Sequence, residues 1–410
     1  MLHECSRDPA LVRRMARRDA ARFRWTSCAA VMLIGSCHAD PFTTPAAHAA
    51  GPSGSGNDVT LTFNVEQDYW PAWTEDGRGI LYAFVDPAMP NHRCVGLLPA
   101  AGGTLTWDLC DNRAIRRDSS STYGGFALDS TGRLLLTEGV SASRGLLPQP
   151  VSTLWLTDTA HPYLRTALAT TPLAVEGTQF TWLSQLRWTG PQTFLLLAGQ
   201  FETFTHCVNL LVGDKVAHQC IATDTSWEIG PSAVLSGALT DRGASLHLVP
   251  GSTGASEFST AQAGATLVFA SGSRLLSVPA AGGTPTVVAS AGVPIAGVSC
   301  KGDSCVYATD SLEVSIDQPS ARFFDSDSLT PVGPAQLRKV SLTTGATNVI
   351  AAGVMPAVFA SPAISPVTGD LVVQVGGNWG RLQTYASYGS GQRILDSGNG
   401  VLHLLKGIVP

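Results

Sequence analysis

Residues 68–82 read DYWPAWTEDGRGILY, and this stretch is the most informative about the fold. Aromatic and apolar residues precede an Asp76-Gly77 pair, and a second apolar run follows it. An Asp-Gly pair between two such runs is a strong signal for a tight turn joining antiparallel strands. The stretch therefore predicts a strand, a turn and a second strand, with the aromatic side chains packed between neighbouring sheets.

Similar strand–turn–strand units recur along the chain. After the first unit, they begin near Gly125, Leu186, Gly237, Gly297 and Pro362. A second kind of hairpin starts at Leu97, Ser277 and Lys339, and the first two copies share the sequence PAAGGT. One such unit cannot bury both faces of its sheet, whereas a ring of units can. The repetition therefore favours a ring of small sheets.

The first unit resembles the WD40-like (PD40) repeat of TolB-type β-propellers at six positions: Asp68, Pro71, Trp73, Asp76, Gly77 and Tyr82. The PAAGGT segments resemble the hairpin between the third and fourth strands of that family. The resemblance implies an all-β propeller of four-stranded antiparallel sheets over residues 59–410. Six units predict six blades; a seventh, degenerate blade within residues 243–300 and a pair of β-sandwiches are the alternatives.

The first strand of this domain, residues 59–65, is expected to complete the last blade beside residues 401–405. Such a pairing of the two ends of the domain would close the ring.

The N-terminus has the pattern of a secretory signal. Residues 1–36 hold seven Arg and three acidic residues, a net charge of +4, followed by the short apolar run CAAVMLI at residues 28–34. A basic region, a brief apolar core and small residues are typical of a signal peptide. The apolar run is shorter than the roughly 20 residues that span a membrane. Met15 is an alternative start that gives a signal of ordinary length.

Residues 34–37, Ile-Gly-Ser-Cys, resemble the lipobox of bacterial lipoproteins. The resemblance implies that residues 1–36 are removed and that Cys37 is lipidated, and His38 after it favours the outer membrane. An ordinary signal peptide, cut near residues 47–50, is the alternative. Residues 37–58 are rich in Pro, Ala, Gly and Ser. They are expected to form a flexible linker with a reach of about 25 Å.

Six of the nine cysteines lie in the propeller domain as close pairs: Cys94/Cys110, Cys207/Cys220 and Cys300/Cys305. In the second pair, a hairpin turning at Gly213-Asp214 sets the two cysteines directly opposite each other. No Cys-x-x-Cys or His pair at ligand spacing supports a zinc site. Free thiols are the remaining alternative, and three disulfides in an oxidising compartment are the favoured interpretation.

The sequence contains no catalytic, metal-binding or cofactor-binding motif, so it predicts no cofactor. Trp70 and Trp73 could form a sugar-stacking platform, but their place in the repeat favours packing between blades. The net charge of −5, with 14% charged and 44% hydrophobic residues, excludes a disordered chain and argues against a nucleic-acid partner.

The leading hypothesis is a cell-envelope lipoprotein, attached to the membrane only through its N-terminal lipid. Its propeller would bind an envelope protein or a small ligand. The rival hypothesis is a secreted propeller enzyme of the lactonase, glycan lyase or hydrolase type, with its active site in the central funnel. Family resemblance carries most of the weight of the first hypothesis.

Overall fold

The computed structural model describes residues 58–61, 68–86, 89–110, 119–142, 151–212, 215–309, 312–314, 329–331, 336–352, 359–375 and 401–409. The chain divides into two units, Met1–Thr44 and Pro45–Pro410, and every described residue belongs to the second. The predicted signal peptide, Cys37 and the linker up to residue 57 therefore lie outside the described residues. In the described ranges, no helix is long and apolar enough to cross a membrane.

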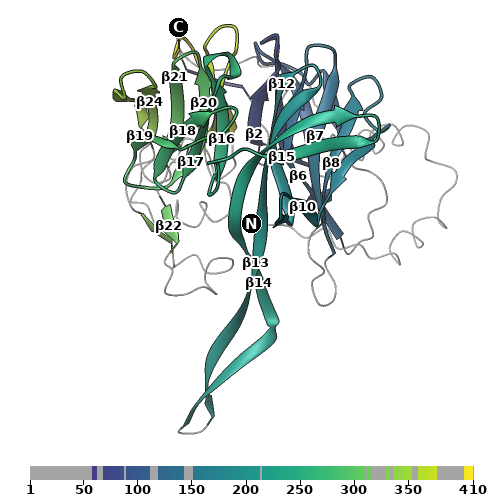
Figure 1. Ribbon diagram of the computed structural model, residues 1–410, viewed down its shortest axis with the longest axis vertical. Helices are drawn as coiled ribbons and strands as arrows, with labels where there is room; N and C mark the ends of the chain where they lie inside the picture. The colour runs from purple at the N-terminus through teal and green to yellow at the C-terminus, as the bar shows by residue number, and fades with distance from the viewer. Residues whose placement is uncertain are drawn as a thin grey trace, which may run out of the picture. The chain divides into compact units, whose positions relative to one another are not determined.

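The described strands form six four-stranded antiparallel groups, which we number blades 1 to 6 (Figure 1). Blade 1 contains β2 (Asp68–Trp73), β3 (Gly79–Asp86), β4 (Met89–Pro99) and β5 (Trp107–Leu109). Blade 2 contains β6 (Ser119–Leu128), β7 (Arg133–Ala142), β8 (Val151–Asp158) and β9 (Thr166–Thr170). A single parallel pair, His92 with Ser121, joins these two blades into one larger sheet.

The remaining blades follow in chain order, and strands of the last come from both ends of the domain. Blade 3 contains β12 (Trp182–Gly190), β13 (Thr193–Val212), β14 (Lys215–Thr240) and β15 (Gly243–Leu248). Blade 4 contains β16 (Glu257–Ala261), β17 (Thr266–Ser271), β18 (Arg274–Pro279) and β19 (Thr286–Ser290). Blade 5 contains β20 (Ile295–Lys301), β21 (Ser304–Thr309), β24 (Gln336–Ser341) and β25 (Thr347–Ala352). Blade 6 contains β26 (Phe359–Ile364), β27 (Leu371–Val375), β28 (Val401–Leu405) and β1 (Asp58–Thr60).

Short elements lie outside the four-stranded groups, one of them between blades 2 and 3 and the others within blades 5 and 4. Two two-stranded sheets are formed by β10 (Leu173–Val175) with β11 (Thr178–Phe180) and by β22 (Leu312–Val314) with β23 (Leu329–Pro331). A short 3-10 helix, η1, spans Gln262–Gly264 between β16 and β17.

The first strands of the blades contact one another in order, β2 to β6, β12, β16, β20 and β26, and β26 contacts β2 again. This cyclic order is that of a β-propeller, as predicted. Each of five described hydrophobic clusters draws its buried residues from two consecutive blades. In the described part of the chain, the core therefore lies between the sheets, where each blade covers the face of the next.

The ring is closed by the two ends of the domain. Asp58, Val59 and Thr60 of β1 pair with Leu405, Leu404 and His403 of β28. The predicted closure is confirmed, with β1 as the outer strand of the last blade.

The unit predicted at Gly237 is not the first hairpin of a blade. Gly237 lies in β14, and β14 with β15 forms the outer hairpin of blade 3. The fourth blade begins at Glu257 instead. The Asp241–Gly243 segment resembles the repeat's turn, whereas blade 4 turns through η1, which lacks an Asp-Gly pair. The count of six blades is unaffected, and residues 243–300 hold blade 4 rather than a seventh blade.

Strands β13 and β14 continue far beyond their sheet as a two-stranded ribbon (Figure 1). Their pairing runs from Thr193 with Ala238 to Val212 with Lys215, and Cys207 is the Cα partner of Cys220. The predicted register is therefore confirmed. The side chains of residues 201–231 lie outside the described part of the chain, so the disulfide between these cysteines remains a prediction.

Disulfides join the other two pairs. Cys94 in β4 is bonded to Cys110, just after β5, and Cys300 in β20 is bonded to Cys305 in β21. Each bond links neighbouring strands of one hairpin or loop, so the bonds fix local pairing within blades 1 and 5.

Candidate functional site

The residues of the first repeat hold the blade together. Asp68 and Pro71 are buried in β2, and Tyr82 is fully buried in β3. The indole N–H of Trp73 donates to the carbonyl of Ala363 in blade 6 (2.8 Å), so this side chain spans the closing interface of the ring. Trp73 therefore packs between blades 1 and 6, as its place in the repeat predicts.

The Asp76-Gly77 turn is built as the sequence predicts. Gly77 has a φ of +66°, which glycine adopts without strain. The Asp76 carboxylate accepts hydrogen bonds from the Thr74 hydroxyl (2.6 Å) and the Arg78 backbone N–H (3.0 Å). These bonds hold the pKa of Asp76 below its ordinary value, and the bond from Thr74 has the largest effect. The turn positions β2 against β3, and the Asp76 carboxylate stabilises the turn.

A cavity of about 960 Å³ lies among the first strands of the blades. Its lining includes residues of β2, β6, β12, β16, β20 and β26 and of the turns that follow them. We call this cavity the central channel. Because all six blades contribute to its wall, it is the place where side chains far apart in sequence meet.

Irregular pairing shapes the wall of the channel. The register between the first and second strands shifts near Trp70, Gly124, Gln185, Gly297 and Ser361, in five of the six blades. Bulges of this kind turn side chains away from the regular alternation and recur beside functional sites. Trp70 and Ser361 also have φ values of +50° and +46°. The wall of the channel is therefore built from recurrent bulges.

Hydrogen bonds tie the channel wall from blade to blade. Ser130 N–H of blade 2 donates to Glu75 of blade 1 (3.1 Å), and the Trp188 indole of blade 3 donates to Ala127 O of blade 2 (3.0 Å). Cys300 N–H of blade 5 donates to Ser259 of blade 4 (3.0 Å), and Ile364 N–H of blade 6 donates to Ser299 of blade 5 (2.9 Å). The Trp73 indole of blade 1 donates to Ala363 O of blade 6 (2.8 Å) and completes the ring. Charged or polar groups that bridge rigid strands in this way fix the geometry of a cavity before any ligand arrives.

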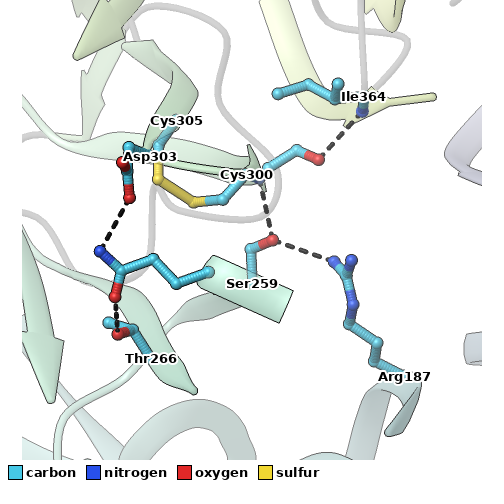
Figure 2. The surroundings of a disulfide bond; sticks show 9 residues. Arg187, Ser259, Thr266, Cys300, Asp303, Cys305 and Ile364 are labelled. Carbon is cyan, nitrogen blue, oxygen red and sulfur yellow. Dashed lines mark hydrogen bonds between the residues drawn. A yellow bond between two sulfur atoms is a disulfide. The ribbon is translucent and has the colours of Figure 1, made fainter. Parts of the chain in front are cut away.

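Blades 3 and 4 are joined by two polar side chains of β12. Gln185, at the bulge, accepts from the Phe258 N–H (2.8 Å) and donates to the Phe258 carbonyl (3.1 Å). Arg187 donates from Nη1 to the Ser259 hydroxyl (3.0 Å), as Figure 2 shows. Leu186 and Trp188, which alternate with them, are buried in the core between blades 2 and 3. Alternation along β12 therefore sends its polar residues toward blade 4.

Arg187 is partly buried in the channel wall. Burial lowers the pKa of its guanidinium, and the charge of Glu75 acts in the opposite direction. Glu75 itself is exposed and lines the same channel from blade 1. A guanidinium stays protonated in proteins, so Arg187 is a fixed positive charge in the wall.

Glu257, the first residue of β16, also lines the channel. Burial raises the pKa of its carboxyl to about 7, although a hydrogen bond with Gln185 acts to lower it. A carboxyl whose pKa lies near neutrality changes charge in the physiological range. Perturbed groups of this kind in a cleft are candidates for functional residues.

The other charged residues of the channel have partners. Asp129 pairs with Arg133 (2.6 Å), and Arg133 also donates to the Pro191 carbonyl (2.6 Å). Burial acts to raise the pKa of Asp129, but hydrogen bonds from Thr131 and Arg133 outweigh it and the pKa is lowered. Lys301 donates to the Val367 carbonyl (3.3 Å). Among the described residues, no group of three or more His, Cys, Asp and Glu side chains could hold a metal ion.

Sequence reasoning missed Arg187, Glu257 and Gln185. A signal for Arg187 exists, because aligning the repeats on their turns places it where blades 1, 2 and 6 have Ala72, Ala127 and Ala363. Glu257 offers no such signal, since it precedes a hairpin that the repeat pattern did not reveal. The six predicted motif residues and the cysteines of the two disulfides do not converge on a reactive centre; they support the blades.

Comparison with known proteins extends only to the fold. No family model matches the chain, and no curated protein matches its sequence. Among solved structures, a calcium-binding protein, regucalcin, from Agrobacterium tumefaciens is 13% identical, with a TM-score of 0.48 over 85% of this chain and 93% of that one. A gluconolactonase from Xanthomonas campestris is 14% identical, with a TM-score of 0.47 over 88% and 92% of the two chains.

TolB from Acinetobacter baumannii is also similar, with 10% identity and a TM-score of 0.42 over 74% of this chain and 58% of that one. Likenesses this distant carry no argument about activity or partners. The β-propeller assignment rests on the chain itself, on six four-stranded groups whose first strands follow one another in a closed ring.

Proposed function

We propose that this chain is a cell-envelope lipoprotein whose β-propeller is a binding module, with the central channel as its binding site. The observation that carries the proposal is the channel, a cavity of about 960 Å³ walled by all six blades. Inter-blade hydrogen bonds hold this wall in place, and concave sites with a few fixed polar groups are the usual form of a ligand site.

The envelope location is supported by two independent features. The N-terminal sequence has the pattern of a lipoprotein signal, ending at Cys37. The disulfides Cys94–Cys110 and Cys300–Cys305 belong to an oxidising compartment, because thiols are kept reduced in the cytosol. Lipidation of Cys37 and retention at the outer membrane are part of the proposal.

A photo-crosslinking experiment in living cells tests the proposal. A photoreactive amino acid replaces Thr189, which is exposed and lines the channel; the matched control position is Val349, exposed in the outer strand β25 of blade 5. We expect one reproducible envelope protein or ligand to be captured from position 189 and not from position 349. The Cys37→Ala variant, which lacks the lipid, is expected to lose this capture.

Three outcomes would count against the proposal. Equal capture from both positions would place binding outside the channel. Capture of abundant, unrelated proteins alone would contradict the proposed binding function. A Cys37→Ala protein that stays in the membrane and unprocessed would favour a plain signal sequence over a lipoprotein.

An enzyme is the second candidate, and Glu257 is the observation that favours it. A carboxyl with a pKa of about 7 in a cavity suits general acid–base catalysis. Hydrolysis of a lactone or a glycan by the full-length protein, lost in Glu257→Gln with the fold intact, would establish this activity.

A further inference from the structure

Arg187 has more hydrogen-bond donors than the described residues use. A guanidinium carries five N–H donors in a planar fork, and the bond to Ser259 occupies one of them. Within the described residues, no carboxylate forms an ion pair with this guanidinium. By contrast, the other channel arginine, Arg133, is paired with Asp129 at 2.6 Å. Arg187 is therefore a cation held in the wall with donors to spare.

Its orientation is fixed by the neighbouring blade. The Ser259 hydroxyl accepts from both Arg187 and the Cys300 backbone N–H, so it anchors Nη1 at the junction of blades 4 and 5 (Figure 2). A guanidinium anchored on one side still presents its remaining N–H groups in a rigid fork, which suits a carboxylate better than a flexible ammonium does.

The surroundings of Arg187 combine apolar and hydrogen-bonding groups. Trp70 and Trp182, both partly buried, line the channel and offer apolar surface to the body of a ligand. Glu257 lies on the same strand as Ser259, two residues earlier, and it also lines the channel. The guanidinium of Arg187, the carboxyl of Glu257 and apolar side chains thus line the same cavity.

We propose that the central channel binds a small organic carboxylate, with its carboxylate on the free donors of Arg187 and its apolar part against the channel wall. This inference rests on the proposed binding function, and it names the class of ligand.

Binding should also depend on pH. The pKa of Glu257 lies at about 7, so above neutrality Glu257 adds a negative charge to the channel that holds the ligand. The other charges around β16 are Arg187 of β12 and Lys301 of β20, whereas β17 (TLVFAS) carries none. Glu75 and the Asp129–Arg133 pair line the same channel. Affinity is expected to fall as the pH rises from 6 to 8.

Benzoate and its neutral counterpart benzamide are the probes. Calorimetric titration of the full-length protein in detergent at pH 6 is expected to show binding of benzoate and not of benzamide. The Arg187→Gln variant should bind benzoate at least tenfold more weakly, because it loses the charge-assisted hydrogen bonds to the carboxylate. The Arg187→Lys variant keeps the positive charge but lacks the planar pair of donors, so its affinity for benzoate should lie between those of the wild type and Arg187→Gln.

Two further variants separate a ligand site from a structural tie. Arg274→Gln removes an exposed positive charge at the turn between β17 and β18 and should bind benzoate normally. Glu75→Gln removes the carboxylate whose charge acts on Arg187, so it should bind benzoate more tightly. If Arg187 only joined blades 3 and 4, its replacement would lower thermal stability without changing this order of affinities.

The proposal is overturned if the wild-type protein binds no benzoate, if benzamide binds equally well, or if Arg187→Gln retains full affinity while folded. These results are separable from the crosslinking at Thr189. Benzoate binding without crosslinked capture would support the carboxylate site and contradict a macromolecular partner in the channel. Crosslinked capture without benzoate binding would retain the binding module and reject this ligand class.

Discussion

Glu257 carries an energetic cost that depends on pH. Its folded pKa of about 7 lies above the ordinary value of 4.5, so the folded protein holds this proton more tightly than the unfolded chain does. Below pH 4.5 the carboxyl is neutral in both states and imposes no penalty. Between pH 4.5 and 7 only the unfolded chain ionises, so the free energy of unfolding falls as the pH rises.

The Glu257→Gln variant should remove this loss. At about 1.4 kcal/mol for each pH unit, the upper limit of the gain is about 3 kcal/mol at pH 8, with no gain at pH 4. Urea unfolding at the two pH values measures the difference. Glu75→Gln, which removes an exposed carboxylate from the same channel, controls for the change in charge; an equal gain in that variant would contradict the assignment to Glu257.

At the scale of the strand, two tryptophans perform the same task on different blades. Trp73 at the end of β2 donates to Ala363 of blade 6, and Trp188 in β12 donates to Ala127 of blade 2. Each indole thus reaches the first strand of the preceding blade. Blades 1 and 3 share this tryptophan beside the turn, whereas blades 2 and 6 have Leu128 and Ile364 at the same position.

Replacing either tryptophan by phenylalanine should destabilise the ring through the lost hydrogen bond. We expect Trp73→Phe and Trp188→Phe each to cost about 1 kcal/mol beyond the effect of the smaller ring, as read from urea unfolding. Trp155→Phe is the matched control, because the buried Nε1 of Trp155 has no hydrogen-bond partner among the described residues. If Trp155→Phe lowered the free energy of unfolding as much as Trp73→Phe and Trp188→Phe, the role of the hydrogen bond would be refuted.

At the scale of the whole domain, stability depends on ring closure through three residues. Asp58–Thr60 of β1, which precede blade 1 in the chain, pair with β28 of blade 6, and β2 of blade 1 packs on β26 of blade 6. Without β1, blade 6 loses its outer strand and also the backbone hydrogen bonds that join the two ends of the domain.

Converting residues 58–60 to Gly-Pro-Gly should therefore lower the unfolding midpoint and make blade 6 the first site of protease cleavage. The same change at residues 347–349 of β25 removes pairing from an equivalent outer strand of blade 5, where closure is not involved. We expect the smaller effect there, measured by urea unfolding and limited proteolysis. Equal effects would mean that β1 contributes only as an edge strand.

The sequence predicted what local spacing determines. Turns such as Asp76-Gly77 located five of the six first hairpins, and counting outward from Gly213-Asp214 set Cys207 opposite Cys220. Blade 4 was misplaced because η1 replaces the expected turn. The channel residues were not predicted, since a closed ring brings Arg187 and Glu75 into one cavity from blades that no sequence spacing relates.

The pairing of β1 with β28 also imposes an order in time. During synthesis, Asp58–Thr60 emerges before any blade, and its partner Val401–Leu405 emerges after blades 1 to 5. Those blades can complete their sheets as they appear, but the sixth waits until residue 405 has been added. A product terminated before residue 401 keeps an unpaired strand edge on β27, which invites pairing with other chains. Ring closure thus distinguishes finished from unfinished molecules.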